Sequence, residues 1–387
     1  MGRIGWIDAV RGIGCMLVII IHFYHDALQV LWPTISGSVL VIEDHRLLID
    51  TLRNYADIGW RPPFYEFILG GVNIGKLGVI LFFLVSGFVV PFSLREGQHA
   101  LTRFSISRFF RLYPIYWVSL ILILLAPIPI REMSTSDIAM NFTMFQKFFF
   151  IPDLNGVAWT LQIELAFYII CAALFWMGWL GSPAKNLIVA ALFAACAIGF
   201  AVIRSSTSFS APIALPLSLT LMFAAHIWRK FLLKEAPVSP LLLAATLVTV
   251  FAGVIIACAI GYGDRWVQYV ATYVTAIVAF GVVSTGLVRI AFKPLLGLGT
   301  VSYSAYLLHP VVGKLTIPPF IAALVPILGA GSYSALILVS MLLSIAVTLL
   351  VSWVTYNYIE RPSISFGRDV FKRVRAGADR RSVQGNT

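Results

Sequence analysis

Residues 77–94 read LGVILFFLVSGFVVPFSL and contain no charged side chain. A run of this kind is typical of a helix that crosses a membrane, because a hydrocarbon core about 30 Å thick needs about 20 helical residues. The whole chain of 387 residues has the same character, since 59% of it is hydrophobic, 12% is charged and its mean hydropathy is +0.91. Such a composition excludes nucleic-acid-binding proteins, secreted disulfide scaffolds and two-domain cytosolic enzymes.

The apolar runs predict an all-α fold, a polytopic membrane bundle of about ten transmembrane helices. The expected spans are residues 9–31, 77–94, 112–130, 157–179, 187–203, 211–228, 239–260, 267–288, 300–328 and 334–359. The ninth span contains Pro310 and the pair Pro318 and Pro319, so we expect it to be broken or kinked.

Basic residues gather in the segments that an even number of spans places on the same side as the two termini. Because Lys and Arg are enriched in cytoplasmic loops, we expect both termini to be cytoplasmic. Residues 1–360 would form the membrane domain, in which residues 32–76 are an outer loop long enough to act as a lid and residues 131–156 are a second outer loop. Residues 361–387 form a basic cytoplasmic tail, expected to lie loosely ordered against anionic lipid.

Arg11 and His22 are two ionisable groups on the first span. They share one face of the helix, since eleven residues bring the chain only about 20° beyond three full turns, and they are separated by about 16 Å along the axis. Asp8 and Asp26 continue the stripe, and Asp26 can hold a charged or tautomer-fixed imidazole. Ionisable groups at membrane depth are costly and are therefore functional candidates. The alternative is that His22 is only a structural hydrogen-bonding residue.

Two further ionisable side chains lie within predicted spans. Glu164 follows Trp159 on the fourth span, whose orientation brings the carboxylate near the depth of His22. His309 on the ninth span reaches about 14 Å into the membrane. The alternatives are that Glu164 pairs with Arg or Lys for assembly, and that His309 makes a hydrogen bond that stabilises a kink beside Pro310.

Arg108 and Arg111 lie in the predicted cytoplasmic segment between the second and third spans. At i and i+3 they share a helix face, which suits the phosphates of an anionic cytosolic ligand, although basic residues here can also serve only as topology anchors. With the stripe on the first span they outline a path from a basic cytoplasmic mouth to an imidazole and an acid nearer the outer face. Two functions fit: an enzyme with a cytosolic donor and an outer acceptor, or a proton-coupled transporter with His22 and Glu164 as relay groups.

No metal site is expected. The four cysteines fall singly within apolar runs, without the spacing of metal ligands, and read as small core residues. On the first span, Gly12 and Gly14 should let another helix approach closely.

Five motifs in order along the chain resemble those of the integral-membrane acyltransferase family 3, which includes glycan O-acetyltransferases, rhizobial Nod-factor acetyltransferases and macrolide acyltransferases. The motifs are WIDAVRGI at 6–13 followed by His22, FFLVSGF at 82–88, RFFRLYP at 108–114, WTLQIELAFY at 159–168 and SYSAYLLHP at 302–310. Thr160 stands where the family usually has Ser, which keeps a hydroxyl at this position.

The resemblance implies ten helices in the bacterial cytoplasmic (inner) membrane and an O-acyltransferase activity. The implied donor is acyl-CoA, usually acetyl-CoA, held from the cytoplasm, and the implied acceptor is a hydroxyl of an extracytoplasmic or lipid-linked saccharide. The implied roles are His22 as the catalytic imidazole, Arg11 as its companion, Glu164 at the site, and Arg108 with Arg111 at the CoA end.

Such a reaction needs a base that works near neutral pH, because a sugar hydroxyl is a poor nucleophile, and His22 is placed for this role. The phosphates of CoA would bind Arg108 and Arg111, and its pantetheine arm would thread the polar stripe towards His22. The outer loops 32–76 and 131–156 are expected to contact the acceptor.

The remaining candidates surround this reaction. Glu164 is expected to orient His22 or the acceptor hydroxyl, and Ser86 or Tyr306 to donate a hydrogen bond to the oxyanion. His309 and Asp26 are further candidates on the acceptor side.

Overall fold

The structure is a computed structural model that describes residues 5–36, 71–94, 97–287, 293–329 and 331–384. Residues 37–70, which make up most of the predicted lid, lie outside this part of the chain. The main helices are α1 (Gly5–Ser36), α4 (Ile74–Val89), α5 (Ala100–Leu125), α6 (Thr135–Thr143), α7 (Trp159–Trp176), α8 (Pro183–Ser206), α9 (Ala214–Leu232), α10 (Pro240–Gly261), α11 (Trp266–Ser284), α12 (Lys293–Leu328), α13 (Tyr333–Thr355) and α14 (Arg361–Gln384). The described residues include nine helical segments long and apolar enough to cross a membrane. The predicted all-α polytopic bundle is therefore confirmed.

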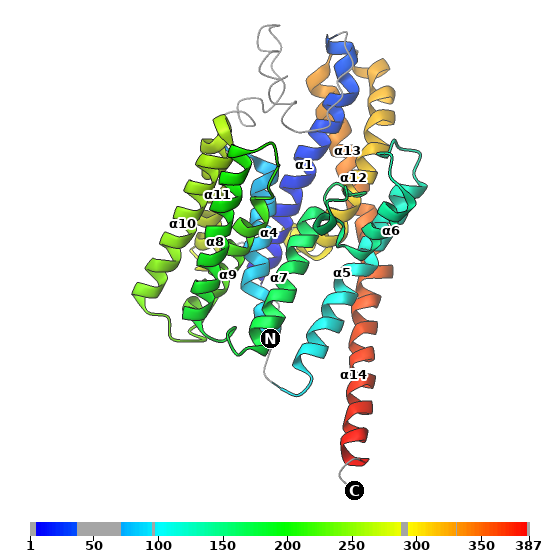
Figure 1. The fold of residues 1–387 in the computed structure, drawn as a ribbon. Coiled ribbons are helices and arrows are strands. Elements are labelled where there is room, and N and C mark those ends of the chain that lie inside the picture. The colour runs from blue at the N-terminus through cyan, green and yellow to red at the C-terminus, as the bar shows by residue number, and fades with distance from the viewer. Residues whose placement is uncertain (1–4, 37–70, 95–96, 288–292, 330, 385–387) are drawn as a thin grey trace.

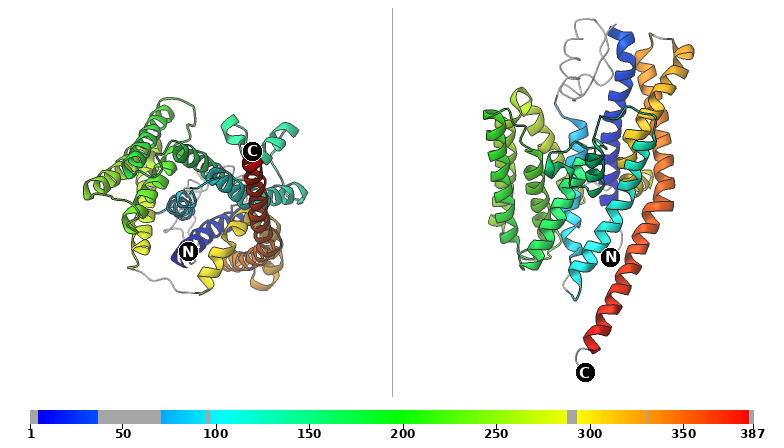
Figure 2. Two further views of the ribbon diagram at one scale, coloured as in Figure 1. Left: turned by 90° about the horizontal axis from the view of Figure 1, so that it is seen from below. Right: turned by 45° about the vertical axis from the view of Figure 1, so that its right-hand side comes forward.

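The helices form two groups with α4 between them (Figure 1). α1, α12 and α13 pack together on one side, and α8, α9, α10 and α11 on the other. α4 contacts α1 in the first group and α9 and α11 in the second, while α7 reaches both α4 and α9. Seen along the bundle, α4 lies near the middle (Figure 2). α1, α4 and α7 therefore border the junction between the two groups.

Helix starts follow ordinary capping chemistry. Ser239 accepts a hydrogen bond from the backbone N–H of Leu242 at 3.1 Å, and Pro240 supplies the first residue of α10, where a missing N–H costs nothing. Asn73 caps α4 in the same way, because its Oδ1 accepts from the N–H of Lys76 at 2.9 Å. This cap fixes Lys76 in the first turn of α4.

Two predicted spans differ from the helices that carry them. The third was placed at residues 112–130, but α5 begins at Ala100 and ends at Leu125. The prediction was wrong there because Arg108 and Arg111 lower the hydropathy of a segment whose arginines face the inside of the protein. The sixth span, predicted at residues 211–228, lies on α9, which is 19 residues long and is not among the nine segments.

The ninth span was expected to be broken or kinked, and α12 is not broken, because it is one continuous helix of 36 residues through its prolines. Pro310 has no N–H to donate to the carbonyl of Tyr306 four residues earlier. The Nδ1 of His309 lies 2.8 Å from that same carbonyl oxygen and donates to it. The side chain before the proline thus donates to the carbonyl oxygen that the proline leaves without a backbone donor.

Residues 361–384 of the C-terminal tail form a helix, where a loosely ordered segment was expected. A π-helical turn (Tyr356–Glu360) joins α13 to α14, and α14 packs along α5. Phe366 meets Phe110 edge to face with ring centroids 5.4 Å apart, and Ser363 donates to the carbonyl of Phe110 at 3.0 Å. The tail is ordered over this stretch because one face of it has a partner.

Close helix packing around α1 depends on glycine, as predicted. A Cβ built at Gly12 would lie 2.7 Å from the carbonyl oxygen of Leu295 on α12, and one at Gly14 would lie 2.9 Å from that of Gly78 on α4. Both distances are shorter than real Cβ contacts, so α1 is wedged between α4 and α12 at backbone contact.

The variant Gly12→Ala should therefore lower the free energy of unfolding by about 1–3 kcal/mol, the usual cost of overpacking. Gly199→Ala on α8 is the matched control, because its Cβ would meet nothing within 4 Å. It should be neutral or stabilising, since Ala is favoured over Gly in a helix by about 0.5–1 kcal/mol. Thermal unfolding of both variants in detergent is the measurement, and equal stability of the two would contradict the wedge.

Candidate active site

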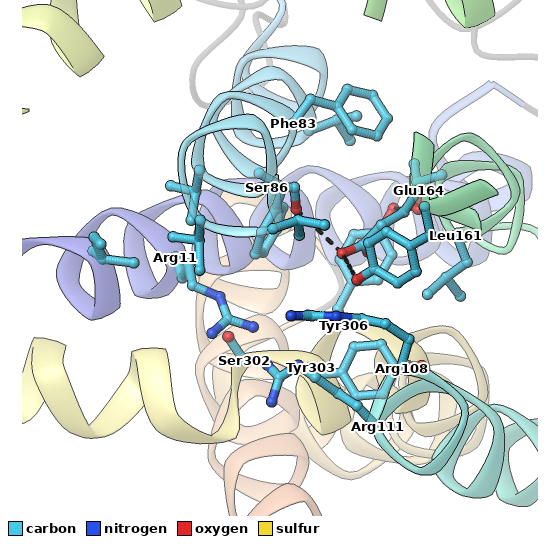
Figure 3. Close-up of a pocket in the computed structure, with 18 residues that line it drawn as sticks. Arg11, Phe83, Ser86, Arg108, Arg111, Leu161, Glu164, Ser302, Tyr303 and Tyr306 are labelled. Atoms are coloured by element: carbon cyan, nitrogen blue, oxygen red, sulfur yellow. Dashed lines mark hydrogen bonds between the residues drawn. The ribbon is translucent and has the colours of Figure 1, made fainter. Parts of the chain in front are cut away.

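A cavity of about 370 Å³ lies at the junction of α1, α4, α5, α7 and α12. It brings together six of the predicted site residues, which come from all five helices: Arg11, Ser86, Arg108, Arg111, Glu164 and Tyr306. Figure 3 shows the side chains of Arg11, from α1, and of Arg108 and Arg111, from α5, directed into this cavity. We call it the arginine cavity.

Arg108 keeps donor capacity for a ligand. Its Nη2 donates to Ser93 Oγ at 2.8 Å, and its guanidinium lies 5.2 Å from the ring of Tyr168, so the side chain is held by a hydroxyl and an aromatic face. Its Nε is buried and has no hydrogen-bond partner in the described part of the chain. A buried donor without a partner is costly, and an anionic oxygen in the cavity would satisfy it.

Glu164 is held by hydroxyl groups. Ser86 Oγ donates to Glu164 Oε1 at 3.2 Å, and the hydroxyl of Tyr168, one turn further along α7, donates to the same oxygen. The dashed lines in Figure 3 mark these two bonds. The hydroxyl groups of Ser86 and Tyr168 therefore hold the carboxylate in place in the arginine cavity. Because Ser86 donates its proton to Glu164, it has no second proton to donate to a ligand.

Glu360 is a buried acid that the sequence reasoning did not select. It is 2% exposed, and its Oε1 lies 4.0 Å from Nη1 of Arg111, which itself is 28% exposed. Its Oε2 accepts from Ser304 Oγ on α12 at 2.7 Å. The signal in the sequence is a lone acid next to Arg361 at the predicted cytoplasmic boundary, where basic residues are the rule.

A second cavity, of about 510 Å³, adjoins the first. Val79 and Tyr306 line both, so these two side chains form a shared wall. His22 lines the second cavity, which we call the imidazole cavity, and not the arginine cavity. Glu164 and His22 thus face different cavities, with Tyr306 common to both.

His22 has the tautomer that a base requires. Its Nδ1 lies 2.8 Å from the carbonyl oxygen of Val18, which can only accept, so Nδ1 carries a proton. In the neutral imidazole Nε2 then holds the free electron pair. The ring of His309 lies beside it, with ring centroids 5.0 Å apart, and the Nε2 of His309 has no hydrogen-bond partner in the described residues.

Asp26 lies elsewhere. Its Oδ2 lies against Gly313 of α12, where an added Cβ would come within 2.8 Å, and Asp26 is not among the described residues that line either cavity. Four residues on from His22, it therefore faces the α1–α12 contact. Within the described residues, no cluster of three or more His, Cys, Asp or Glu side chains has the arrangement of a metal site.

Tyr306 is the better placed of the two predicted oxyanion donors. Its hydroxyl oxygen lies 3.0 Å from Thr160 Oγ1, and its ring meets Phe82 edge to face with centroids 5.5 Å apart. Thr160 Oγ1 also lies 2.9 Å from the carbonyl oxygen of Val157, which can only accept, so the single proton of Thr160 is shared between two acceptors. An oxyanion in the wall between the cavities would compete with Thr160 Oγ1 for the proton of Tyr306.

The chain matches a protein-family model described as an acyltransferase domain over residues 4–357. It is also similar to nodulation protein 10 of Rhizobium leguminosarum bv. viciae, with 30% identity over a stretch that covers 30% of this chain and 38% of that protein. The chain thus spans less than half the length of this curated relative in the match. No solved structure matches.

The family match covers nearly the whole of the helical bundle, including both cavities and their shared wall. Together with the nine apolar helical segments of the described residues, it makes this an integral membrane protein of an acyltransferase family. The chain belongs to the integral-membrane acyltransferase family 3.

Proposed function

We propose that this acyltransferase moves an acyl group, acetyl in the first instance, from cytosolic acyl-CoA to a hydroxyl of an extracytoplasmic or lipid-linked saccharide. The membrane would be the bacterial cytoplasmic membrane, with both chain termini inside. One observation carries the proposal: an arginine-lined cavity and a histidine-lined cavity meet at a wall made by Val79 and Tyr306. Two substrates that arrive from opposite sides can meet there.

The donor would enter the arginine cavity. Arg11, Arg108 and Arg111 line it with three positive charges, and the described lining holds one acid, Glu164. The surplus charge supports binding of the phosphate-bearing end of acyl-CoA or of its thioester carbonyl. Glu164 would hold Tyr168 through its hydroxyl group, and the ring of Tyr168 would in turn hold the guanidinium of Arg108 in place. Glu164 would thus act as a positioning residue.

The acceptor would enter the imidazole cavity. Its hydroxyl oxygen attacks the thioester carbonyl carbon while His22 Nε2 takes the hydroxyl proton. The oxyanion that develops would accept a hydrogen bond from Tyr306. When the carbon–sulfur bond breaks, the proton passes from His22 to the sulfur of CoA, so the products are the O-acyl saccharide and free CoA.

The test of the function is to supply acetyl-CoA labelled in its acetyl group to the purified protein in liposomes with saccharide extracted from the host membrane. Label on the saccharide is the expected result. Mass spectrometry of surface polysaccharides from cells with and without the protein identifies the acceptor. Substrate flux that depends on a proton gradient and needs no acyl-CoA would instead favour the transporter, a hypothesis to which the family match lends no support.

The donor site is tested by Arg108→Ala. Loss of a hydrogen bond to a charged group costs about 1.5–3 kcal/mol, so the dissociation constant for acetyl-CoA should rise about tenfold or more. Arg103→Ala is the matched control, because Arg103 lies on the same helix, is exposed and does not line the cavity. Titration calorimetry in detergent measures the dissociation constant of each variant for acetyl-CoA. An unchanged value for Arg108→Ala would mean that Arg108 does not bind the donor and serves only to set the topology.

A further inference from the structure

The imidazole cavity collects basic residues on the side of the membrane where they are unexpected. The described part of the chain has five basic residues in segments predicted to be outside: Lys76, Arg131, Lys147, Arg204 and Arg265. Lys76, Arg204 and Arg265 all line the imidazole cavity, although they come from α4, α8 and the turn before α11. Basic residues are depleted on the outer side of a membrane protein, so the positive-inside rule does not explain why these three line one cavity there.

Aromatic faces, not carboxylates, hold two of these cations. The ammonium of Lys76 lies 4.8 Å from the ring centroid of Trp159. The guanidinium of Arg204 lies 5.4 Å from the ring of Tyr262, which is itself stacked on Tyr269 with centroids 3.9 Å apart. A cation–π contact orients a side chain and leaves its charge uncancelled. Within the described residues neither Lys76 nor Arg204 forms an ion pair.

Two other cations of the bundle are paired with carboxylates. Arg229 lies 2.9 Å from Glu235, and Lys147, on the same predicted side as the cavity, lies 3.1 Å from Asp153. The described lining of the imidazole cavity contains no Asp or Glu. Charges taken partly out of water without a counter-charge are unfavourable, so, as far as the described lining goes, an anion in the cavity would stabilise Lys76 and Arg204.

We propose that this cavity recognises an acid group, a phosphate or a carboxylate, on the saccharide acceptor. This rests on the proposed function and narrows its acceptor to an anionic one. Lys76 and Arg204 would bind the acid group, and the faces of Trp159 and Tyr269 would contact the sugar rings. The acid group then anchors the acceptor so that a neighbouring hydroxyl lies at His22, which lines the same cavity.

The test is direct binding in the absence of acyl-CoA, so that it does not depend on catalysis. Three probes are used with the full-length protein in detergent: trigalacturonate, which carries carboxylates, a disaccharide linked to polyprenyl pyrophosphate, and neutral galactotriose. At least one anionic probe should bind about tenfold or more tightly than galactotriose, and its affinity should fall as salt is raised. Which anionic probe binds distinguishes an acidic sugar from a lipid-linked pyrophosphate as the source of the charge.

The double variant Lys76→Met with Arg204→Met should abolish this preference and leave galactotriose binding unchanged. Arg131→Met is the matched control, since Arg131 lies on the same predicted side but lines a different cavity. It should keep the preference. The proposal would be overturned if galactotriose bound as tightly as both anionic probes, or if neither anionic probe bound. It would also be overturned if the double variant kept the preference for an anionic probe.

This outcome is separable from that of the proposed function. If labelled acetyl reaches a neutral saccharide and the double variant transfers it at the normal rate, the function stands and the anionic acceptor is refuted. If anionic probes bind through Lys76 and Arg204 but no label moves from acetyl-CoA, the imidazole cavity still binds an anionic ligand, and the proposal that acetyl-CoA is the donor is refuted.

Discussion

Acyl transfer should fall by about 10²–10⁴-fold when His22 is replaced by alanine, the range that a positioned general base contributes. The reason is local: the bond from Nδ1 to the carbonyl of Val18 leaves Nε2 as the only basic atom that His22 offers to the cavity. The measurement is the initial rate of label transfer from acetyl-CoA in liposomes, with protein amount and thermal stability determined on the same preparation.

His22→Gln is the companion variant. Glutamine can still donate an N–H towards Val18 but has no basic nitrogen, so it should insert and fold like the unmodified protein and be as inactive as His22→Ala. A rate near the wild-type value in either variant would refute the assignment of His22 as the base and leave it a structural hydrogen-bonding residue.

The second large effect is expected on stability, at the pair between Arg111 and Glu360. Arg111→Met would leave a carboxylate that is 2% exposed with only Ser304 as a described hydrogen-bond partner. Removing one partner of a buried ion pair typically costs 3–5 kcal/mol. Because Arg111 is 28% exposed and the pair is 4.0 Å long, we expect about 2–4 kcal/mol here.

A double-mutant cycle isolates this pair. Glu360→Gln removes the charge but keeps an acceptor for Ser304, and the combination of Arg111→Met with Glu360→Gln should recover part of the stability that Arg111→Met loses. Unfolding in a denaturing detergent gives the four free energies. Strictly additive effects would mean that the two side chains do not stabilise one another across α5 and the π-helical turn.

The sequence predicted the helices well where lipid surrounds them and less well where protein does. The spans that became α4, α7, α8, α10 and α11 stand close to their predicted positions, because hydropathy measures contact with lipid. It fails for α5, where Arg108 and Arg111 face a cavity, and for the end of α13, where the chain continues as α14 because α5 offers it a partner. Neither partner can be seen in a linear pattern of hydropathy.

The site divides in the same way. Periodicity and motif order selected Arg11, His22 and Glu164, and the structure puts each against one of two adjoining cavities. The partners of these residues come from distant segments, as with Glu360 beside Arg111 or Lys76 beside Trp159. Such pairs depend on which helices are neighbours, and a single sequence does not contain that information. Asp26 was selected by the stripe on α1 but points to α12, since the stripe is wider than the cavity.

The wall made by Val79 and Tyr306 has a consequence for the energetics of the cell. If aqueous substrates approach it from the two faces of the membrane, the permeability barrier at this spot is formed by the side chains of Val79 and Tyr306. Transfer then has to proceed without opening a continuous water column, through which protons would run down their gradient. A smaller residue in place of Tyr306 would join the arginine cavity to the imidazole cavity. Its first measurable effect would be proton leakage across the membrane, and the loss of catalysis would follow.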